Sequence, residues 1–382
     1  MIKILIVDDE PDVELLMKQR FRRQLKENEF ILFFAKNGIE ALDKLSKDSG
    51  IRMVISDINM PEMDGLTLLD NIQKEYPEVM AIIVSAYGDM NNIRTAMNRG
   101  AFDFVTKPIN FEDLTTTINK TLEHIQQLLK AEKNKNKLEG LLYELNVARD
   151  IQQSILPKEF ISNESIQVQA KMTAAKEIGG DFYDFFWINK EEIGLVIADV
   201  SGKGVPAALF MTVSRTLIRS HATKETSPGK CLEKVNVLLE QSNSNNMFVT
   251  TFYGILNVKT GRFIYSNGGH NPPILVSSGQ ISMLPTTKDM ALGILPLDRF
   301  QENTIELKKN DLLFLYTDGV TEAMNLEDKC FGEVALQAVL KNNVDLSAKN
   351  TIEKVEAELK GFTLSAEQSD DITMLAIRYI GG

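Results

Sequence analysis

The sequence predicts an α/β chain in three parts: a doubly wound parallel sheet, a long helix, and a second domain of layered strands and helices. Three observations support this prediction. Short apolar runs alternate with amphipathic stretches up to about residue 122, the segment 111–156 has one glycine and no proline, and β-rich runs with frequent turn residues begin near residue 157. We therefore expect a first domain at 1–122, a helical linker at 123–156 and a second domain at 157–382.

The first part contains five apolar runs that we interpret as strands, each separated from the next by a helical pattern. The predicted strands cover residues 3–7, 31–35, 53–56, 81–85 and 102–106. The predicted helices lie at 13–25, 39–45, 66–72 and 93–98. Continuous apolar strands between amphipathic helices are typical of a parallel sheet that is covered on both faces. Such a sheet places its ligand site at the carboxyl ends of the strands.

The segment 111–156 carries an apolar stripe at helical spacing, which the polar run 130–137 interrupts. The stripe consists of Leu114, Ile118, Leu122, Ile125 and Leu129 before that run, and of Leu138, Leu141, Leu145, Ala148, Ile151 and Ile155 after it. The pattern is compatible with a solvated surface helix or with a two-chain coiled coil. We expect the coiled coil, and hence a homodimer through this linker.

The third part has strand-like runs that follow one another directly. The predicted strands cover 194–198, 248–257, 262–266, 274–276, 311–316 and 373–379, and the predicted helices cover 205–221, 229–241, 333–341 and 347–360. Consecutive strands favour antiparallel sheets packed with helices, an α+β arrangement.

The composition is that of a globular protein and excludes several functions. Of the 382 residues, 43% are hydrophobic and 25% are charged, and the formal net charge is −11. That charge argues against a nucleic-acid partner, which requires a basic surface. The two cysteines form no disulfide framework, and no apolar run approaches the roughly 18 residues of a membrane span. We expect a cytoplasmic protein that binds neither nucleic acid nor membrane.

Polar side chains stand where the predicted strands of the first part end. Asp8 and Asp9 follow the first strand, Asp57 the third, Ser85 ends the fourth, and Lys107 follows the fifth. These ends meet at one edge of a parallel sheet, where clustered carboxylates favour a hard cation such as Mg²⁺. A carboxylate can be the nucleophile in phosphoryl transfer, while the metal and a lysine neutralise the phosphoryl oxygens. The first part is therefore predicted to carry a phosphorylatable aspartate.

With their neighbours, these residues resemble the receiver domain of two-component response regulators over residues 1–122. The matching stretches are residues 6–11, 56–61 with 64–65, Ser85-Ala86-Tyr87, and Lys107-Pro108. The resemblance implies a flavodoxin-like fold, phosphorylation of Asp57 by a sensor histidine kinase, and a cis Lys107–Pro108 peptide bond. It also implies Mg²⁺ bound by Asp8, Asp9, Asp57 and the Asn59 carbonyl, with Ser85 and Phe104 as the switch hydroxyl and the switch aromatic ring.

Acidic residues stand at four places in the third part, and two of them are directly beside a glycine. They are Asp181, Asp199, Asp318 and the pair Asp370-Asp371, each next to a predicted strand or to a glycine-rich turn. No histidine or cysteine cluster accompanies them, so the oxygen ligands favour Mg²⁺ or Mn²⁺ over zinc. Two such ions can hold a bridging water and position a phosphoryl group for in-line attack.

These motifs resemble the PPM-type serine/threonine phosphatases, specifically the SpoIIE-like branch, over about residues 145–380. Further matching stretches are 148–157, 268–273 and 292–293. The resemblance implies an α-β-β-α layered domain in which Asp181, Asp199, Asp318 and Asp370 hold two Mn²⁺ or Mg²⁺ ions, with the Val200 carbonyl as a further ligand. Whether Asp370 or Asp371 is the ligand stays open at this point. We expect His270 to order its glycine-rich turn rather than to act as a general acid.

Together these features predict a response regulator whose output is a metal-dependent protein serine/threonine phosphatase. By analogy with the family, its substrate would be a phosphorylated anti-sigma-factor antagonist, whose dephosphorylation frees a sigma factor by partner switching. The linker helix would transmit the receiver's rearrangement to the segment carrying Asp181 or to the strand carrying Asp199. The alternative is a non-catalytic adaptor that binds a sigma factor or its regulator. A missing metal-binding acid would favour the adaptor, and none is missing.

Overall fold

The computed structural model describes residues 1–86, 88–224, 227–241, 243, 245–286, 289–296 and 299–381. Tyr87, which belongs to one of the motifs quoted above, lies outside this set. The chain divides into two compact units, Met1–Gly140 and Leu141–Gly382. Residues 123–155 of the expected linker lie within a single helix, α6 (Phe111–Ile155), which contains this division. Among the described helices, none combines the length and apolar character of a membrane span.

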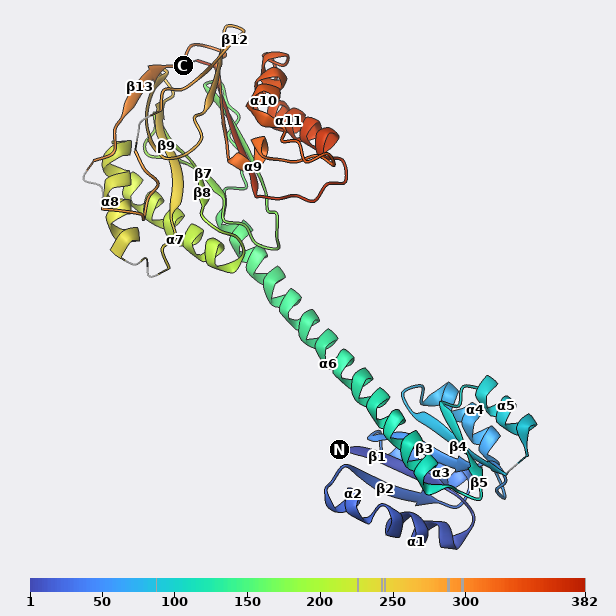
Figure 1. Ribbon diagram of the computed structural model, residues 1–382. Helices are drawn as coiled ribbons and strands as arrows, with labels where there is room; N and C mark the ends of the chain where they lie inside the picture. Colours follow the sequence, from blue (N-terminus) through green and yellow to red (C-terminus); the bar gives the residue numbers. More distant parts are fainter. Residues whose placement is uncertain are drawn as a thin grey trace. The chain divides into compact units, whose positions relative to one another are not determined.

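The first unit contains a five-stranded parallel sheet with the order β2-β1-β3-β4-β5 (Figure 1). Its strands are β1 (Ile2–Val7), β2 (Phe30–Ala35), β3 (Ile51–Asp57), β4 (Met80–Ala86) and β5 (Asp103–Lys107). All four strand pairs are parallel. The doubly wound sheet predicted from the apolar runs is therefore confirmed.

Helices cover both faces of this sheet. They are α1 (Pro11–Arg20), α2 (Arg22–Lys26), α3 (Gly38–Lys47), α4 (Gly65–Glu75), α5 (Met90–Asn98) and the first part of α6. Along β1, Ile4 and Ile6 pack in one cluster with α1 and α6, whereas Leu5 and Val7 pack in another with α3 and α4. Both faces are buried, which explains the uninterrupted apolar runs. The single helix expected at 13–25 is wrong: the helix breaks at Phe21, whose buried ring packs against Phe30 at 5.7 Å.

The second unit contains two five-stranded sheets, with the orders β13-β10-β9-β8-β7 and β12-β11-β14-β15-β6. The first sheet comprises β7 (Phe182–Trp187), β8 (Glu192–Val200), β9 (Val249–Asn257), β10 (Arg262–Gly268) and β13 (Asn303–Glu306). The second comprises β6 (Ile166–Thr173), β11 (Ile274–Ser277), β12 (Gln280–Met283), β14 (Leu312–Tyr316) and β15 (Ile372–Tyr379). Their strand pairs are antiparallel, as the consecutive strands predicted.

Helices lie on the outer sides of the two sheets, which gives the α-β-β-α layers implied by the resemblance. Figure 1 shows α7 (Val205–Ala222) and α8 (Pro228–Gln241) on one side, and α10 (Gly332–Lys341) and α11 (Ala348–Thr363) on the other. A short helix, α9 (Asp318–Thr321), follows β14. The sequence analysis did not foresee β6, β7, β12, β13 or α9.

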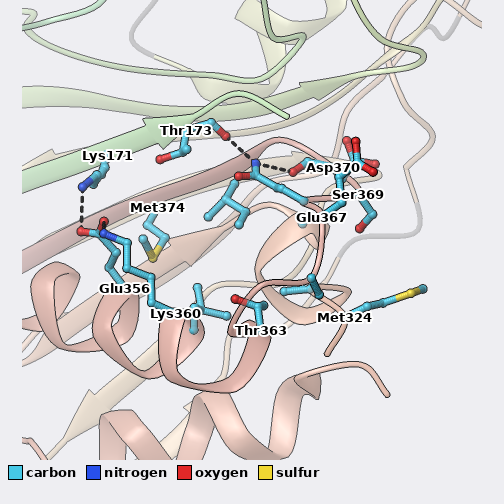
Figure 2. A pocket seen from close by; sticks show the side chains of 16 residues that line it. Lys171, Thr173, Met324, Glu356, Lys360, Thr363, Glu367, Ser369, Asp370 and Met374 are labelled. Atoms are coloured by element: carbon cyan, nitrogen blue, oxygen red, sulfur yellow. Dashed lines mark hydrogen bonds and ion pairs between the residues drawn. The ribbon is translucent and has the colours of Figure 1, made fainter. Parts of the chain in front are cut away.

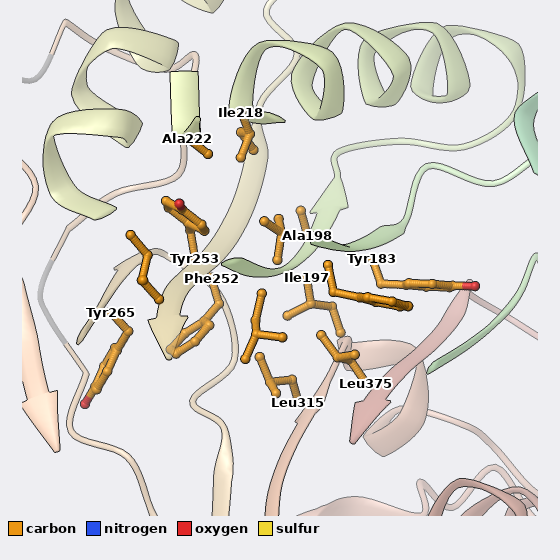
Figure 3. Packing of buried hydrophobic residues seen from close by; sticks show 14 of the residues in the cluster. Tyr183, Ile197, Ala198, Ile218, Ala222, Phe252, Tyr253, Tyr265, Leu315 and Leu375 are labelled. Carbon is orange, nitrogen blue, oxygen red and sulfur yellow. The ribbon is translucent and has the colours of Figure 1, made fainter. Parts of the chain in front are cut away.

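The core of this unit lies between the sheets (Figure 3). Ile197 of β8 and Phe252 of β9 belong to the same buried cluster as Leu315 of β14 and Leu375 of β15. Each of these side chains is fully buried, which stabilises the fold by about 1.5–3 kcal/mol per residue. Because this packing fixes the four strands, it also fixes the acidic residues near their ends.

Candidate functional site

The first site lies at the carboxyl edge of the parallel sheet, around Asp57. Asp57 ends β3 and is buried, and the Ile58 amide donates to its Oδ1 at 2.8 Å. Lys107 Nζ lies 2.8 Å from Asp57 Oδ2, 3.3 Å from Asp8 Oδ2 and 3.2 Å from Glu10 Oε1. Burial lowers the pKa of Lys107, but these ion pairs outweigh it and leave the pKa above its usual value. The lysine is therefore a permanent cation beside the Asp57 carboxylate.

The same edge offers a set of ligands for a hard cation. Carboxylate oxygens of Asp8, Asp9 and Asp57 lie within 4.8 Å of one another, and in the described part of the chain no other group of three acidic, histidine or cysteine residues is as close. Burial raises the pKa of Asp8, so a proton competes with a metal there. Asn59 is exposed on the loop after β3. An all-oxygen set of this kind fits Mg²⁺.

The predicted switch residues lie on the neighbouring strands β4 and β5. The Ser85 hydroxyl is buried and has no hydrogen-bond partner among the described residues. A buried polar group without a partner is unfavourable, and a phosphoryl oxygen would provide one. Phe104 is 36% exposed on β5, and the Lys107–Pro108 peptide bond is cis.

The second site begins where β7 and β8 pair. The register sets Phe182 opposite Ala198 and so places Asp181 opposite Asp199. Asp181 is buried, and Thr317 Oγ1 donates to its Oδ2 at 2.7 Å. Burial, with nearby Asp199 and Asp371, raises the pKa of Asp181 well above its ordinary value. Burial, with nearby Asp318, raises the pKa of Asp199 to about 7. A buried acid beside a partly buried one favours either a shared proton or a cation.

Asp318 and Asp370 reach this region from the other sheet. Asp318 begins α9 just after β14, and burial, with Glu322 and Asp370 nearby, raises its pKa. Lys203, on the loop between β8 and α7, lies 2.9 Å from Asp370 Oδ2 and also donates to the Ser369 carbonyl. The sequence analysis had not singled out Lys203, although it lies within the quoted motif 199–204. Among the described residues, no three acids of this unit are as close to one another as the receiver trio.

Asp371 has different surroundings from Asp370. Its Oδ1 accepts from the Ala175 amide at 2.8 Å, and its Oδ2 accepts from the amides of Gly180 at 2.6 Å and Asp181 at 3.4 Å. These bonds occupy both oxygens of a buried carboxylate. Asp371 therefore positions the segment that carries Asp181. Asp370 is partly exposed, and its oxygens contact the Asp371 amide at 2.8 Å and Lys203 at 2.9 Å, so it is the more accessible of the two acids.

Two glycines permit close backbone approach at this site. A Cβ atom at Gly180 would lie 3.1 Å from the Val200 carbonyl oxygen, and one at Gly319 would lie 2.0 Å from the Asp371 carbonyl oxygen. The first contact brings the Val200 carbonyl next to the Asp181 segment. Gly319 is thus required for packing at the site, and Gly180 allows a close approach that a larger residue would disturb.

Gln152 is a site residue that the sequence analysis missed. It is buried near the end of α6, where its Nε2 donates to the Gly179 carbonyl at 2.7 Å and its Oε1 accepts from the Gly179 amide at 3.3 Å. Gly179 is two residues before Asp181. The helix is therefore joined by a pair of hydrogen bonds to a segment that carries a candidate ligand. The sequence signal that could have identified Gln152 is its position within the quoted motif 148–157.

His270 is buried in its glycine-rich turn. Its amide donates to Asn267 Oδ1 at 2.7 Å, its carbonyl accepts from Asn267 Nδ2 at 2.9 Å, and its Nδ1 lies 2.9 Å from Thr250 Oγ1. Burial lowers the pKa of His270 to about 4, so the ring is neutral at pH 7. These contacts suit a residue that orders the turn.

Fold and site together define a receiver domain joined to a PPM-type phosphatase domain. The family description "Stage II sporulation protein E (SpoIIE)" matches residues 189–380, and "Response regulator receiver domain" matches residues 4–119. The first match covers half of the chain. The chain therefore belongs to the SpoIIE family and carries a response regulator receiver domain at its N-terminal side.

Several curated proteins are similar to the chain. Protein IcfG of Synechocystis sp. is 32% identical over 61% of this chain and 41% of its own length. Phosphoserine phosphatases RsbU and RsbP of Bacillus subtilis are 29% and 26% identical, over 68% and 60% of this chain and 73% and 56% of their own lengths. The chain thus spans less than two thirds of IcfG and RsbP.

A solved structure, the SiaA-PP2C domain of Pseudomonas aeruginosa, superposes with a TM-score of 0.56 at 20% identity. The superposition covers 64% of this chain and 98% of that domain, and at this identity it supports the fold alone.

Proposed function

We propose that phosphorylation of Asp57 controls a metal-dependent protein serine/threonine phosphatase in the second unit. The observation that carries this proposal is the meeting of Asp181 with Asp199 across β7 and β8, beside Asp318 and Asp370 from the facing sheet. Burial, complete at Asp181 and partial at Asp199 and Asp318, raises the pKa values of these three acids, and such carboxylates are unfavourable as anions unless a cation neutralises them. They are therefore suited to binding divalent ions.

The proposed metal ligands of the phosphatase are Asp181, Asp199, Asp318 and Asp370, with the Val200 carbonyl. Two bound Mn²⁺ or Mg²⁺ ions would supply an activated water and a clamp for the phosphoryl group. The chain's own residues position these ligands, because Asp371 and Gln152 hold the backbone before Asp181. Lys203 adds a cation beside Asp370, where it can attract a phosphoryl group.

We propose a phosphorylated anti-sigma-factor antagonist as the substrate, on which the phosphatase would act in partner switching. The similarity to two proteins named phosphoserine phosphatases supports a phosphoserine substrate. A non-catalytic adaptor is disfavoured, since every acid of the proposed metal set is present. The phosphatase and the adaptor differ in one measurable result, the hydrolysis of a phosphoserine substrate.

The proposed switch begins at the receiver. A sensor histidine kinase would phosphorylate Asp57 with Mg²⁺ held by Asp8, Asp9, Asp57 and the Asn59 carbonyl. The new phosphoryl oxygens would attract the unpartnered Ser85 hydroxyl and Lys107, and Phe104 would turn inward. Helix α6, which contributes Leu114 and Ile118 to the receiver core, would then transmit the change to Gln152.

We also propose that α6 pairs with α6 of a second copy. Its middle and later parts expose apolar side chains: Leu128, Leu138, Leu141, Leu142, Val147 and Ile151. A helix that exposes this many apolar residues is stabilised by a partner helix. Light scattering on the full chain should give a dimer mass, and Leu138→Glu with Leu141→Glu should give a monomer. A monomeric wild type at high micromolar concentration would remove this proposal.

The catalytic proposal is tested with the full chain, Mn²⁺, a phosphoserine peptide and p-nitrophenyl phosphate. Asp199→Asn and Asp318→Asn should each abolish hydrolysis of both substrates, whereas Asp328→Asn, an exposed acid on a turn, should retain the wild-type rate. Equal rates in wild type and in both site variants would reject the assignment. No hydrolysis by the wild type would favour the adaptor.

A further inference from the structure

A cavity opens beside the proposed metal site, on the outer side of the second sheet. Its volume is about 310 Å³, and it lies between β6 and β15 on one side and α9 and α11 on the other. In Figure 2, Lys171 and Glu356 lie at one end of the cavity, and Asp370 and Met324 lie at the other. Neither the catalytic proposal nor the proposed switch uses this cavity.

Apolar groups form most of the cavity wall. Ala323, Met324, Leu359, Ile372 and Met374 line it. Methionine side chains adapt to different apolar partners, so such a wall accepts more than one side-chain shape.

Three of the five charged side chains of the lining are paired with one another, and the other two are Glu367 and Asp370. Lys171 Nζ lies 2.6 Å from Glu356 Oε2, and Lys360 Nζ lies 2.5 Å from Glu356 Oε1. The lysine stems therefore add apolar surface, and their charges are compensated at the rim. A ligand that contacts this end of the cavity needs no charge of its own.

The cavity is continuous with the segments that carry the proposed metal ligands. Asp370 lines it directly, and so does Gly319, the residue after Asp318. Gln368 pins this part of the wall, because its Nε2 donates to the Thr173 carbonyl at 2.9 Å and to the Asp370 carbonyl at 2.7 Å. The proposed ligands Asp318 and Asp370 are thus either next to a residue of the cavity wall or part of that wall.

We propose that the cavity binds an apolar side chain of the substrate, on a residue that flanks the phosphoserine. This proposal rests on the proposed function, and it adds a specificity determinant to it. A phosphoryl group held at the acids keeps the neighbouring residues of the same peptide near the cavity, so their effective concentration there is high. Burial of a leucine-sized side chain against the apolar wall then favours one substrate sequence over another.

The test compares phosphoserine peptides that differ at one flanking position. The parent peptide has only alanine and small polar residues around the phosphoserine, and leucine replaces one residue at a time over about three positions on each side. In the wild type with Mn²⁺, leucine at one or more positions should raise kcat/KM by about tenfold or more, the value expected for burying such a side chain. An increase below twofold at every position would overturn the proposal.

Variants that fill the cavity form the second part of the test. Thr363→Trp, at the end of α11, and Ala366→Trp, just beyond it, each place a large ring in the cavity from a partly exposed position. Either should remove the gain from leucine and leave hydrolysis of p-nitrophenyl phosphate within twofold of wild type. The matched control is Ala357→Trp, an exposed position on the same helix outside the cavity, which should keep the gain.

The outcomes separate this proposal from the proposed function. A leucine gain that persists in both filled variants overturns the cavity assignment, although the enzyme remains a phosphatase. Equal loss of peptide and p-nitrophenyl phosphate hydrolysis in both filled variants also overturns it, because the cavity would then only support the active site. No hydrolysis of any substrate by the wild type overturns both proposals.

Discussion

The substitution Gln152→Leu tests whether the end of α6 holds the segment that carries Asp181. Leucine is close to glutamine in size and in helix propensity, so the helix itself should persist. The change removes two hydrogen bonds and leaves the amide and carbonyl of Gly179 without a partner. Each buried group left unpaired costs about 1–3 kcal/mol. The hydrogen bond from the Gly179 amide to Gln152 Oε1 is long, at 3.3 Å, and contributes less than the other one. We therefore expect a total loss of about 2–4 kcal/mol in the free energy of unfolding.

Part of that loss should appear at the metal site. If the Asp181 segment becomes free to leave its ligand position, Mn²⁺ affinity falls by about tenfold for each 1.4 kcal/mol of lost local stability. Calorimetric titration of the metal-free full chain should therefore show at least a tenfold weaker affinity for Gln152→Leu than for wild type.

The matched control is Gln153→Leu, the same substitution at the next residue, which is exposed. It should leave both unfolding and Mn²⁺ affinity near wild type. Affinities that agree within twofold between the two variants would refute the reasoning.

Three further predictions concern the second unit. Asp370→Ala should abolish hydrolysis with little change in urea-induced unfolding. Asp371→Ala should lower the free energy of unfolding by about 2–4 kcal/mol, because it leaves buried amides without an acceptor. A larger loss of stability in Asp370→Ala than in Asp371→Ala would contradict the assignment. Asp199 has a pKa of about 7 in the folded metal-free state, above its unfolded value, so metal-free stability should fall as pH rises from about 4 to 7. Melting temperatures in EDTA should show this fall, Mn²⁺ or Asp199→Asn should reduce it, and a rise over that interval would count against the prediction. Asp184→Ala leaves Arg215, at 2.9 Å and mostly buried, without its partner, and should cost about 3–5 kcal/mol in unfolding; a loss below 1 kcal/mol would show that the pair is solvated.

The fold of the receiver was predictable because its physical cause is local. Residues of β1 alternate between two buried faces, so each strand appears as a continuous apolar run. The strand β7 was not predicted, because the interaction that stabilises it is not local. It contains Asp184, whose charge is compensated by Arg215 and Arg219 from α7, and no sequence pattern shows such a distant pairing. The edge strands β12 and β13 have four residues each and none is buried, so they lack the apolar run that marks β11, a strand of the same length.

The acidic residues of the site were visible in the sequence, but their division of labour was not. The choice between Asp370 and Asp371 depends on amides of Ala175 and Gly180, which lie nearly 200 residues earlier in the chain. The role of Gln152 likewise depends on its contact with Gly179. Sequence motifs therefore located the candidate residues, and tertiary hydrogen bonds support the proposed division between the residue that binds a metal and the residues that position it.

The central claim is that the receiver's aspartate controls turnover at the second site. The most direct measurement is kcat/KM for a phosphoserine peptide with Mn²⁺, with and without beryllofluoride, a mimic of the aspartyl phosphate. The account predicts that beryllofluoride changes the wild-type value by at least about fivefold, as a coupling of 1–3 kcal/mol requires, and leaves Asp57→Ala unchanged. Equal responses of the two proteins, or no response in either, would contradict it.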